Sequence, residues 1–186
     1  MNRRVAFILI LLFSAGVLLI WRPFFDAENQ QNNRRSQIMQ PDFTAQGLQT
    51  RLFESGGKLA HQLNAESMAH YLQIGLTELN QPVYTVYTEN DVATWQISAE
   101  QGTFYDDQTL ILERGVEINA LQPDTAIQQV ITEYLVIDMM AETMRTDYPV
   151  TLFGPRLTIQ GDGLKADLYA EQMELNRHVK TVFEPR

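Results

Sequence analysis

Side chains that commonly carry out chemistry are few in this sequence, and none stands in a recognised catalytic or metal-binding spacing. The three histidines, His61, His70 and His178, lack the H-x-x-x-H spacing of a zinc site, and the chain has no cysteine to supply a thiolate. The serines that follow residue 42 lie in neither a G-x-S-x-G nor an S-x-x-K motif. The adjacent carboxylates Asp106 and Asp107 are typical of a turn. The sequence therefore predicts no metal, no cofactor and no enzymatic activity.

One catalytic alternative stays open, because a serine–histidine–aspartate triad is assembled in space and not along the chain. It is a membrane-anchored hydrolase in which His61 or His178 meets a serine and a carboxylate. No motif supports this alternative, and it predicts that loss of any one member would abolish activity.

The charge of the chain argues against a second class of function. The 186 residues include 23 Asp and Glu against 14 Lys and Arg, so the formal net charge is −9. Proteins that bind nucleic acid neutralise phosphates with Lys and Arg gathered on one face. We therefore expect no nucleic-acid partner, and an anionic ligand would have to be held through apolar contact.

The start of the chain predicts a membrane anchor. Arg3 and Arg4 precede an uncharged stretch that begins at Val5 and ends at Trp21. As a helix this stretch is about 25 Å long, close to the minimum for a bilayer core of about 30 Å. A cleaved signal peptide is the alternative, but no small-x-small cleavage site follows the apolar run. The short, positively charged tail favours a cytoplasmic N-terminus and an exported C-terminal domain.

Three regions follow from this pattern. Residues 1–25 are expected to form the cytoplasmic tip and the transmembrane anchor. Residues 26–41 are polar and rich in Asn and Gln, which predicts a flexible linker. In residues 42–186 apolar residues alternate with a period of two between turn signals. We expect these residues to form one all-β domain, a sandwich, a jelly roll or a barrel.

The strand pattern repeats along the domain. The stretch Thr109–Ile118, TLILERGVEI, predicts a strand, a tight connection and a second strand. Related patterns recur at nearly even spacing around Val83, Val116, Val150 and Val179. Such a regular period indicates an array of one supersecondary unit, here a pair of strands.

The apolar stripes of these strands have two possible roles. The plain role is the packed core of a sandwich, which accounts for most positions. A ligand-binding interior is favoured by the flexible or medium-sized residues at equivalent inward positions, namely Leu79, Met144, Met173 and Phe183. The last strand, Val179–Phe183, contains no proline and few charges, and an unprotected edge is suited to receive another strand.

Several stretches of the chain resemble the LptC family, the single-pass inner-membrane components of lipopolysaccharide transport. Their order and spacing, with the N-terminal anchor and the Gly56-Gly57 hairpin, carry the resemblance more than any single motif does. The stretches are TWQISAE (94–100), LILERGVEINALQPD (110–124), ITE (131–133), PVTLFG (149–154), GDGLKAD (161–167) and VKTVF (179–183).

This resemblance implies a periplasmic β-jelly roll of two antiparallel sheets in an open V, preceded by one transmembrane helix in the inner membrane. It also implies a non-enzymatic function. The domain would receive lipopolysaccharide from the LptBFG ABC transporter, docking through LptF and LptG, and pass it to periplasmic LptA at its C-terminal edge. A structural adaptor that tethers these partners without binding lipid is the alternative.

The resemblance, together with the apolar strand pattern and the unprotected last strand, assigns roles to individual residues. Those expected to bind lipid on the interior apolar face are Leu48, Leu79, Leu110, Leu112, Met144, Met173, Leu175 and Phe183. Those expected to dock partner proteins are Gly154, Val179, Thr181 and Phe183.

Overall fold

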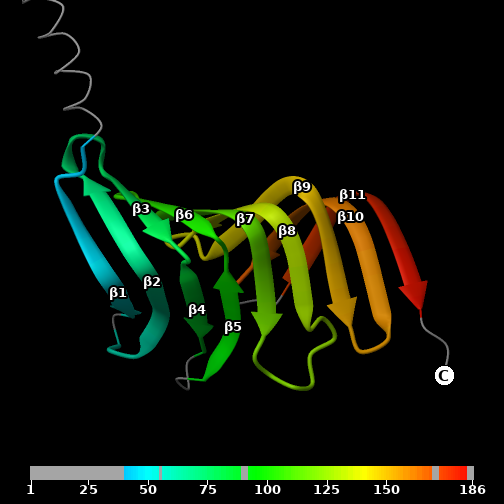
Figure 1. Cartoon of the computed structure of the whole chain (residues 1–186). Helices are drawn as coiled ribbons and strands as arrows, with labels where there is room; N and C mark the ends of the chain where they lie inside the picture. The colour runs from blue at the N-terminus through cyan, green and yellow to red at the C-terminus, as the bar shows by residue number, and fades with distance from the viewer. Residues whose placement is uncertain (1–39, 55, 89–91, 169–171, 184–186) are drawn as a thin grey trace, which may run out of the picture. The chain divides into compact units, whose positions relative to one another are not determined.

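The computed structural model describes residues 40–54, 56–88, 92–168 and 172–183. Apart from one short 3-10 turn, η1 (Leu72–Ile74), these residues form antiparallel β-strands (Figure 1). The strands are β1 (Phe43–Phe53), β2 (Leu59–Tyr71), β3 (Leu76–Asn80), β4 (Val83–Tyr87), β5 (Ala93–Ser98), β6 (Gln101–Tyr105), β7 (Thr109–Ala120), β8 (Gln129–Asp138), β9 (Thr143–Gly154), β10 (Leu157–Asp167) and β11 (Gln172–Phe183). The all-β prediction is confirmed for this part of the chain.

The predicted anchor and nearly all of the predicted linker lie outside the described residues. Within those residues, the structure contains no helix of the length and apolar character that crossing a bilayer requires.

The strands form one hydrogen-bonded sheet in the order β11-β10-β9-β8-β7-β5-β4-β2-β3-β6, in which β1 also pairs with β2 and β6 also pairs with β7. The double pairing of β2 and β7 shows how the sheet is folded. Residues 61–64 of β2 pair with β4, whereas residues 67–71 pair with β3. Residues 110–113 of β7 pair with β6, whereas residues 117–120 pair with β5.

Each long strand therefore passes from one layer of the folded sheet to the other. Layer 1 contains β3, β6 and the β7 segment 110–113, and layer 2 contains β4, β5 and the β7 segment 117–120. Figure 1 shows β7, β8 and β9 arching over this fold. The two sheets implied by the family resemblance are thus two layers of one continuous sheet. We call the line where the strands cross between layers the spine.

Backbone irregularities mark the spine. Between Glu113 and Val116 the β7–β8 register shifts, because two residues of β7 oppose one of β8. The two residues of β7 are Arg114 and Gly115, which have left-handed φ values of 65° and 57°. The stretch predicted as a strand, a connection and a second strand is therefore one strand with a bulge. The prediction of two strands was wrong because a glycine-containing bulge and a tight turn share the same residue types.

The spine also explains the sequence repeat. Val83 is the first residue of β4, immediately after the chain crosses from layer 1 to layer 2. Val116 and Val150 follow the corresponding irregularities in β7 and β9. One period of the repeat is thus one strand passing from layer 1 to layer 2 and the next strand returning.

The core lies between the two layers. Leu110, Leu112 and Ile137 in layer 1 and Ile97 and Ile118 in layer 2 have no exposed surface. In each strand the neighbours of these residues point outward, because successive side chains of a strand alternate between faces. Folding the sheet at the spine is what gives both inner faces a partner.

Candidate apolar ligand groove

The inner faces of the two layers bring together most residues that were predicted to bind a lipid. Four of them are almost fully buried in the interior: Leu79, Leu110, Leu112 and Met144. Three others are partly buried and pack against the same core: Leu48, Met173 and Leu175. The interior is therefore one apolar surface that runs through all the long strands.

Phe183 is placed differently from these buried and partly buried residues. Its register partner is Leu157, so it shares the inner face of β10, because cross-strand partners lie on one face. However, 74% of its surface is exposed, since it ends an edge strand that no further described strand covers. Thr181, opposite Ile159, is exposed as well. The side chain of Val179 lies outside the described residues.

An apolar cavity of about 220 Å³ opens at the β1 end of the interior. Its walls come from both layers and include Leu48 and Leu79 from the predicted set. Sequence reasoning missed the remaining lining residues, which are Phe43, Thr50, Leu52, Leu63, Met68, His70, Thr77, Phe104 and Met139. The alternation of apolar residues in β1 and β2 could have identified Leu52, Leu63 and Met68.

A polar pair interrupts this apolar lining. The Nδ1 atom of His70 lies 2.8 Å from Oγ1 of Thr77, its register partner in β3. On its other side, the His70 ring lies against Phe43, with 4.7 Å between the ring centroids. The pair is half-buried near the end of layer 1 that is remote from the spine.

A second polar pair, His61 and Tyr84, is buried in layer 2. Only 5% of His61 is exposed, and its Nδ1 atom lies 2.9 Å from the Tyr84 hydroxyl. Burial lowers the pKa of His61 from its ordinary value of 6.5, although the nearby Glu54 carboxylate acts in the opposite direction. This pairing with a tyrosine does not provide the serine contact that the hydrolase alternative requires.

The depressed pKa of His61 predicts a loss of stability in weak acid. The unfolded chain binds a proton on this histidine below about pH 6.5, whereas the folded chain binds it only at lower pH. Stability is therefore fully present above about pH 6.5 and falls as the pH drops toward the folded-state pKa, by at most about 1.4 kcal/mol per pH unit. Urea unfolding between pH 7.5 and 5 should show this slope in the wild-type chain and a shallower one in His61→Gln. Equal slopes would contradict the prediction.

Gly154 ends β9 and is enclosed by its own chain. A β-carbon at this position would overlap the carbonyl oxygen of Ala126, which belongs to the loop between β7 and β8. The loop is fixed close to β9, because the backbone N–H of Gln128 donates a hydrogen bond of 2.7 Å to the backbone carbonyl oxygen of Phe153. The contacts that the structure shows for this glycine are thus intramolecular, whereas the sequence-based expectation was a partner.

The two edges of the folded sheet are unpaired along their length within the described residues. At one edge β1 pairs only with β2, and at the other β11 pairs only with β10. Each edge strand crosses the spine and contributes to both layers. An added strand at either edge would extend the apolar interior as well as the hydrogen bonding.

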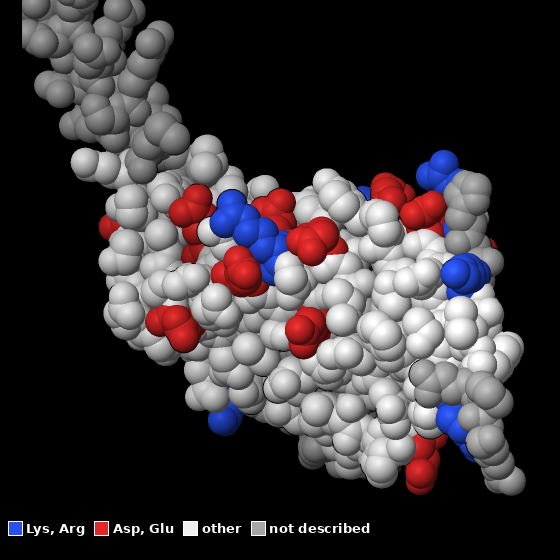
Figure 2. All heavy atoms as spheres, turned by 45° about the vertical axis from the view of Figure 1, so that its right-hand side comes forward, with Lys and Arg blue, Asp and Glu red and all other residues white. Residues whose placement is uncertain are grey.

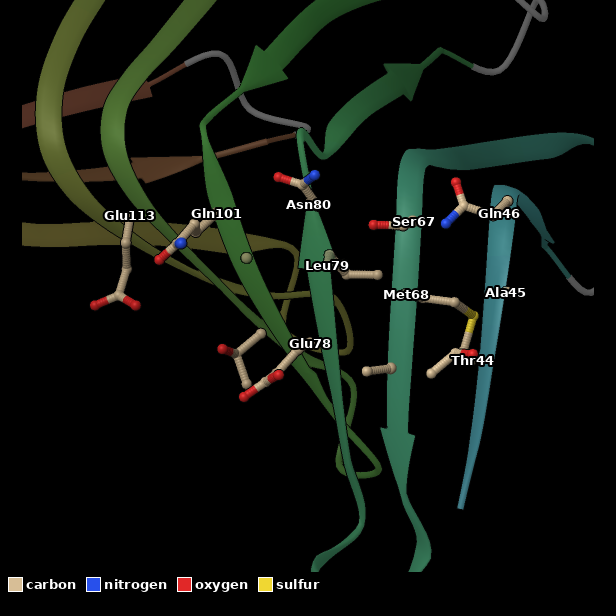
Figure 3. A pocket seen from close by; sticks show the side chains of 13 residues that line it. Thr44, Ala45, Gln46, Ser67, Met68, Glu78, Leu79, Asn80, Gln101 and Glu113 are labelled. Carbon is tan, nitrogen blue, oxygen red and sulfur yellow. The ribbon is translucent and has the colours of Figure 1, made fainter. Parts of the chain in front are cut away.

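A larger hollow of about 590 Å³ lies beside β1, β2, β3 and β6, and its chemistry is different (Figure 3). Its labelled side chains include the carboxylates of Glu78 and Glu113 and the amides of Asn80 and Gln101. Glu78 and Asn80 flank the buried Leu79 in β3, so they point to the opposite face. Because these polar groups share the lining with Ala45, Met68 and Leu79, the hollow is mixed in character and less apolar than the 220 Å³ cavity. The described part of the chain contains no cluster of three or more potential metal ligands.

Charged side chains of both signs are distributed over the surface seen in Figure 2. On the face shown in Figure 2, basic side chains are separated from one another and interspersed with acidic ones. A phosphate-binding surface would need basic groups gathered together.

Comparison with known proteins gives consistent results. The family model described as "Lipopolysaccharide-assembly, LptC-related" matches residues 7–184. The lipopolysaccharide export system protein LptC of Escherichia coli is 26% identical over 144 residues, which cover 77% of this chain and 75% of that protein. LptC of Haemophilus influenzae is 24% identical over 182 residues, with 87% of each chain covered.

A solved structure shares the fold. It is LptH of Pseudomonas aeruginosa, described as the LptA-homologous periplasmic component of the lipopolysaccharide transport device. The TM-score is 0.53 at 9% sequence identity, and the match covers 67% of this chain and 95% of LptH.

Proposed function

We propose a function for this chain from its family: it belongs to the LptC-related family of lipopolysaccharide-assembly proteins, and it acts in lipopolysaccharide transport. In the finer proposal, the domain is held at the inner membrane by the N-terminal segment and works in the periplasm. It receives lipopolysaccharide from the LptBFG transporter and passes it to LptA. The proposal contains no catalytic step.

The observation that carries this proposal is the continuous apolar interior between the two layers, with a cavity at its β1 end. Exposing a lipid chain to water costs about 0.8 kcal/mol per CH₂ group, so its passage across an aqueous space requires an apolar path. The interior would supply such a path inside the domain once the two layers, which pack against each other in this structure, separate around the lipid. Lipid phosphates would remain at the open side in water, which is compatible with a net negative chain.

The two unpaired edges support transfer between proteins. A jelly roll that pairs with β1 or β11 would continue both layers, and the apolar interior would continue with them. We assign the transporter to the β1 edge and LptA to the β11 edge, where Thr181 and Phe183 are exposed. LptH, an LptA homologue, has the same fold, which is compatible with such stacking.

Photo-crosslinking in living cells would test whether lipid enters the interior. Met173 and Glu174 are adjacent in β11, but Met173 packs against the core and Glu174 is exposed on the opposite face. We expect a probe at Met173 to yield a lipopolysaccharide adduct and the matched probe at Glu174 to yield none. Protein adducts alone, or equal lipid adducts at both sites, would favour the adaptor that tethers partners without binding lipid.

A further inference from the structure

The apolar cavity at the β1 end has a distinctly polar lip. Most of its lining is aliphatic or aromatic, whereas His70 and Thr77 place an imidazole and a hydroxyl on its layer 1 side. The third polar lining residue, Thr50, is exposed and lies on β1 in layer 2. A ligand in this cavity would therefore meet an imidazole and a hydroxyl together on the layer 1 side, and the single hydroxyl of Thr50 from layer 2.

The His70 ring is held in a fixed orientation by its two neighbours. Phe43 lies against it with an interplanar angle of 33°, and Thr77 occupies Nδ1. Nε2 has no hydrogen-bond partner among the described residues. If the Thr77 hydroxyl donates to Nδ1, the proton of the neutral ring lies on Nε2, which is then a donor.

We propose that His70 binds the polar linkage of a lipid acyl chain: Nε2 donates a hydrogen bond to the ester or amide carbonyl, while the hydrocarbon chain fills the cavity. Thr77 orients the ring for this contact. The inference rests on the proposed function, because it takes the transported lipid as the ligand. It adds one residue, His70, that determines how far a single acyl chain enters the cavity.

The size of the cavity favours a single hydrocarbon chain as the occupant. Its volume of about 220 Å³ is below the range of roughly 300–1,000 Å³ that is usual for drug-sized ligands. A sugar or phosphate headgroup would also lose its hydration against Leu63, Leu79 and Phe104. An acyl chain would be stabilised by burial against the same apolar side chains. It also carries at one end the carbonyl that Nε2 of His70 would bind.

The test compares the affinity of the full-length protein for labelled lipopolysaccharide in detergent micelles. His70→Phe keeps an aromatic ring beside Phe43 but removes the donor, and should weaken binding about two- to tenfold. His70→Gln restores an amide donor and should recover most of the affinity. The matched control is Tyr71→Phe, which removes an outward hydroxyl that bonds Glu78 across the same strand pair, and should leave affinity unchanged.

Nitrogen NMR of the histidine rings provides a second measurement, and its first readout uses the wild-type protein and so does not depend on a variant folding. Added lipopolysaccharide should shift the Nε2 signal of His70, and Thr77→Val should reduce that shift. If the wild-type protein binds but His70→Phe has unchanged affinity, or the Nε2 signal does not shift, the role of His70 is overturned. The proposed function would still stand. No binding by the wild-type protein would overturn the proposed function itself. A shift at Nε2 on deletion of residues 1–39 without lipid would assign the cavity to the chain's own N-terminal segment.

Discussion

Replacing Gly154 with alanine is expected to lower the free energy of unfolding by about 1–3 kcal/mol, the usual cost of forcing extra atoms into a packed site. The new β-carbon would overlap a backbone oxygen, that of Ala126, and not a flexible side chain. The β7–β8 loop cannot withdraw freely, because the backbone of Gln128 makes two hydrogen bonds. Its N–H donates to the carbonyl oxygen of Phe153, and its carbonyl oxygen accepts from the N–H of Ala120. Gly154→Arg adds a long cationic side chain to the same overlap and should cost more.

Urea unfolding of the full chain, followed through the fluorescence of the buried Trp95, would measure this loss. Gly56→Ala is the matched control, because a β-carbon at Gly56 would meet nothing within 4 Å and its φ is not left-handed. That variant should stay within about 0.5 kcal/mol of the wild type. If Gly154→Ala keeps full stability but loses a partner protein in co-purification, the glycine serves docking, and the intramolecular explanation fails.

Replacing Leu112 with alanine is expected to have the second large effect, a loss of about 2–5 kcal/mol. Leu112 has no exposed surface and lies between the layers, where its side chain also approaches Gly102 in β6. The substitution removes buried methyl groups and leaves a cavity in a core whose two faces are already in contact. If the interior were instead an open groove filled with water in the absence of lipid, Leu112→Ala would lower the free energy of unfolding by much less.

The control for this variant is the adjacent residue. Ile111→Ala removes a similar number of carbon atoms from the outer face of β7, where Ile111 is half-buried, and should cost about 1 kcal/mol. Equal losses for the two variants would show that the interior is not packed as the structure has it. Lipopolysaccharide should then be added to both, since a ligand that fills the interior stabilises the folded state by mass action. We expect that stabilisation to be greater for Leu112→Ala.

The sequence by itself determined that residues after the linker form strands, because their apolar residues alternate with a period of two. It also identified which side of several strands faces inward: Leu79, Leu110, Leu112 and Met144 are all buried as expected. These properties are local, since the pleat of a strand fixes the face of each side chain. The resemblance to the LptC family, which the family comparison confirms, rests on the same local stretches in their order.

Only the tertiary structure decided what the irregular residues do. The pair Arg114-Gly115 could end a strand or bend it, and the pairing with β8 on both sides of the pair makes it a bulge at the spine. His70 and Thr77 are separated along the chain by a turn, so their contact depends on the register of β2 against β3. Gly154 is confined by the carbonyl oxygen of Ala126, which precedes the whole of β8 and β9 in the chain. Contacts of this kind depend on strand register and on the folding of the sheet, and the side-chain pattern of a single strand carries information about neither.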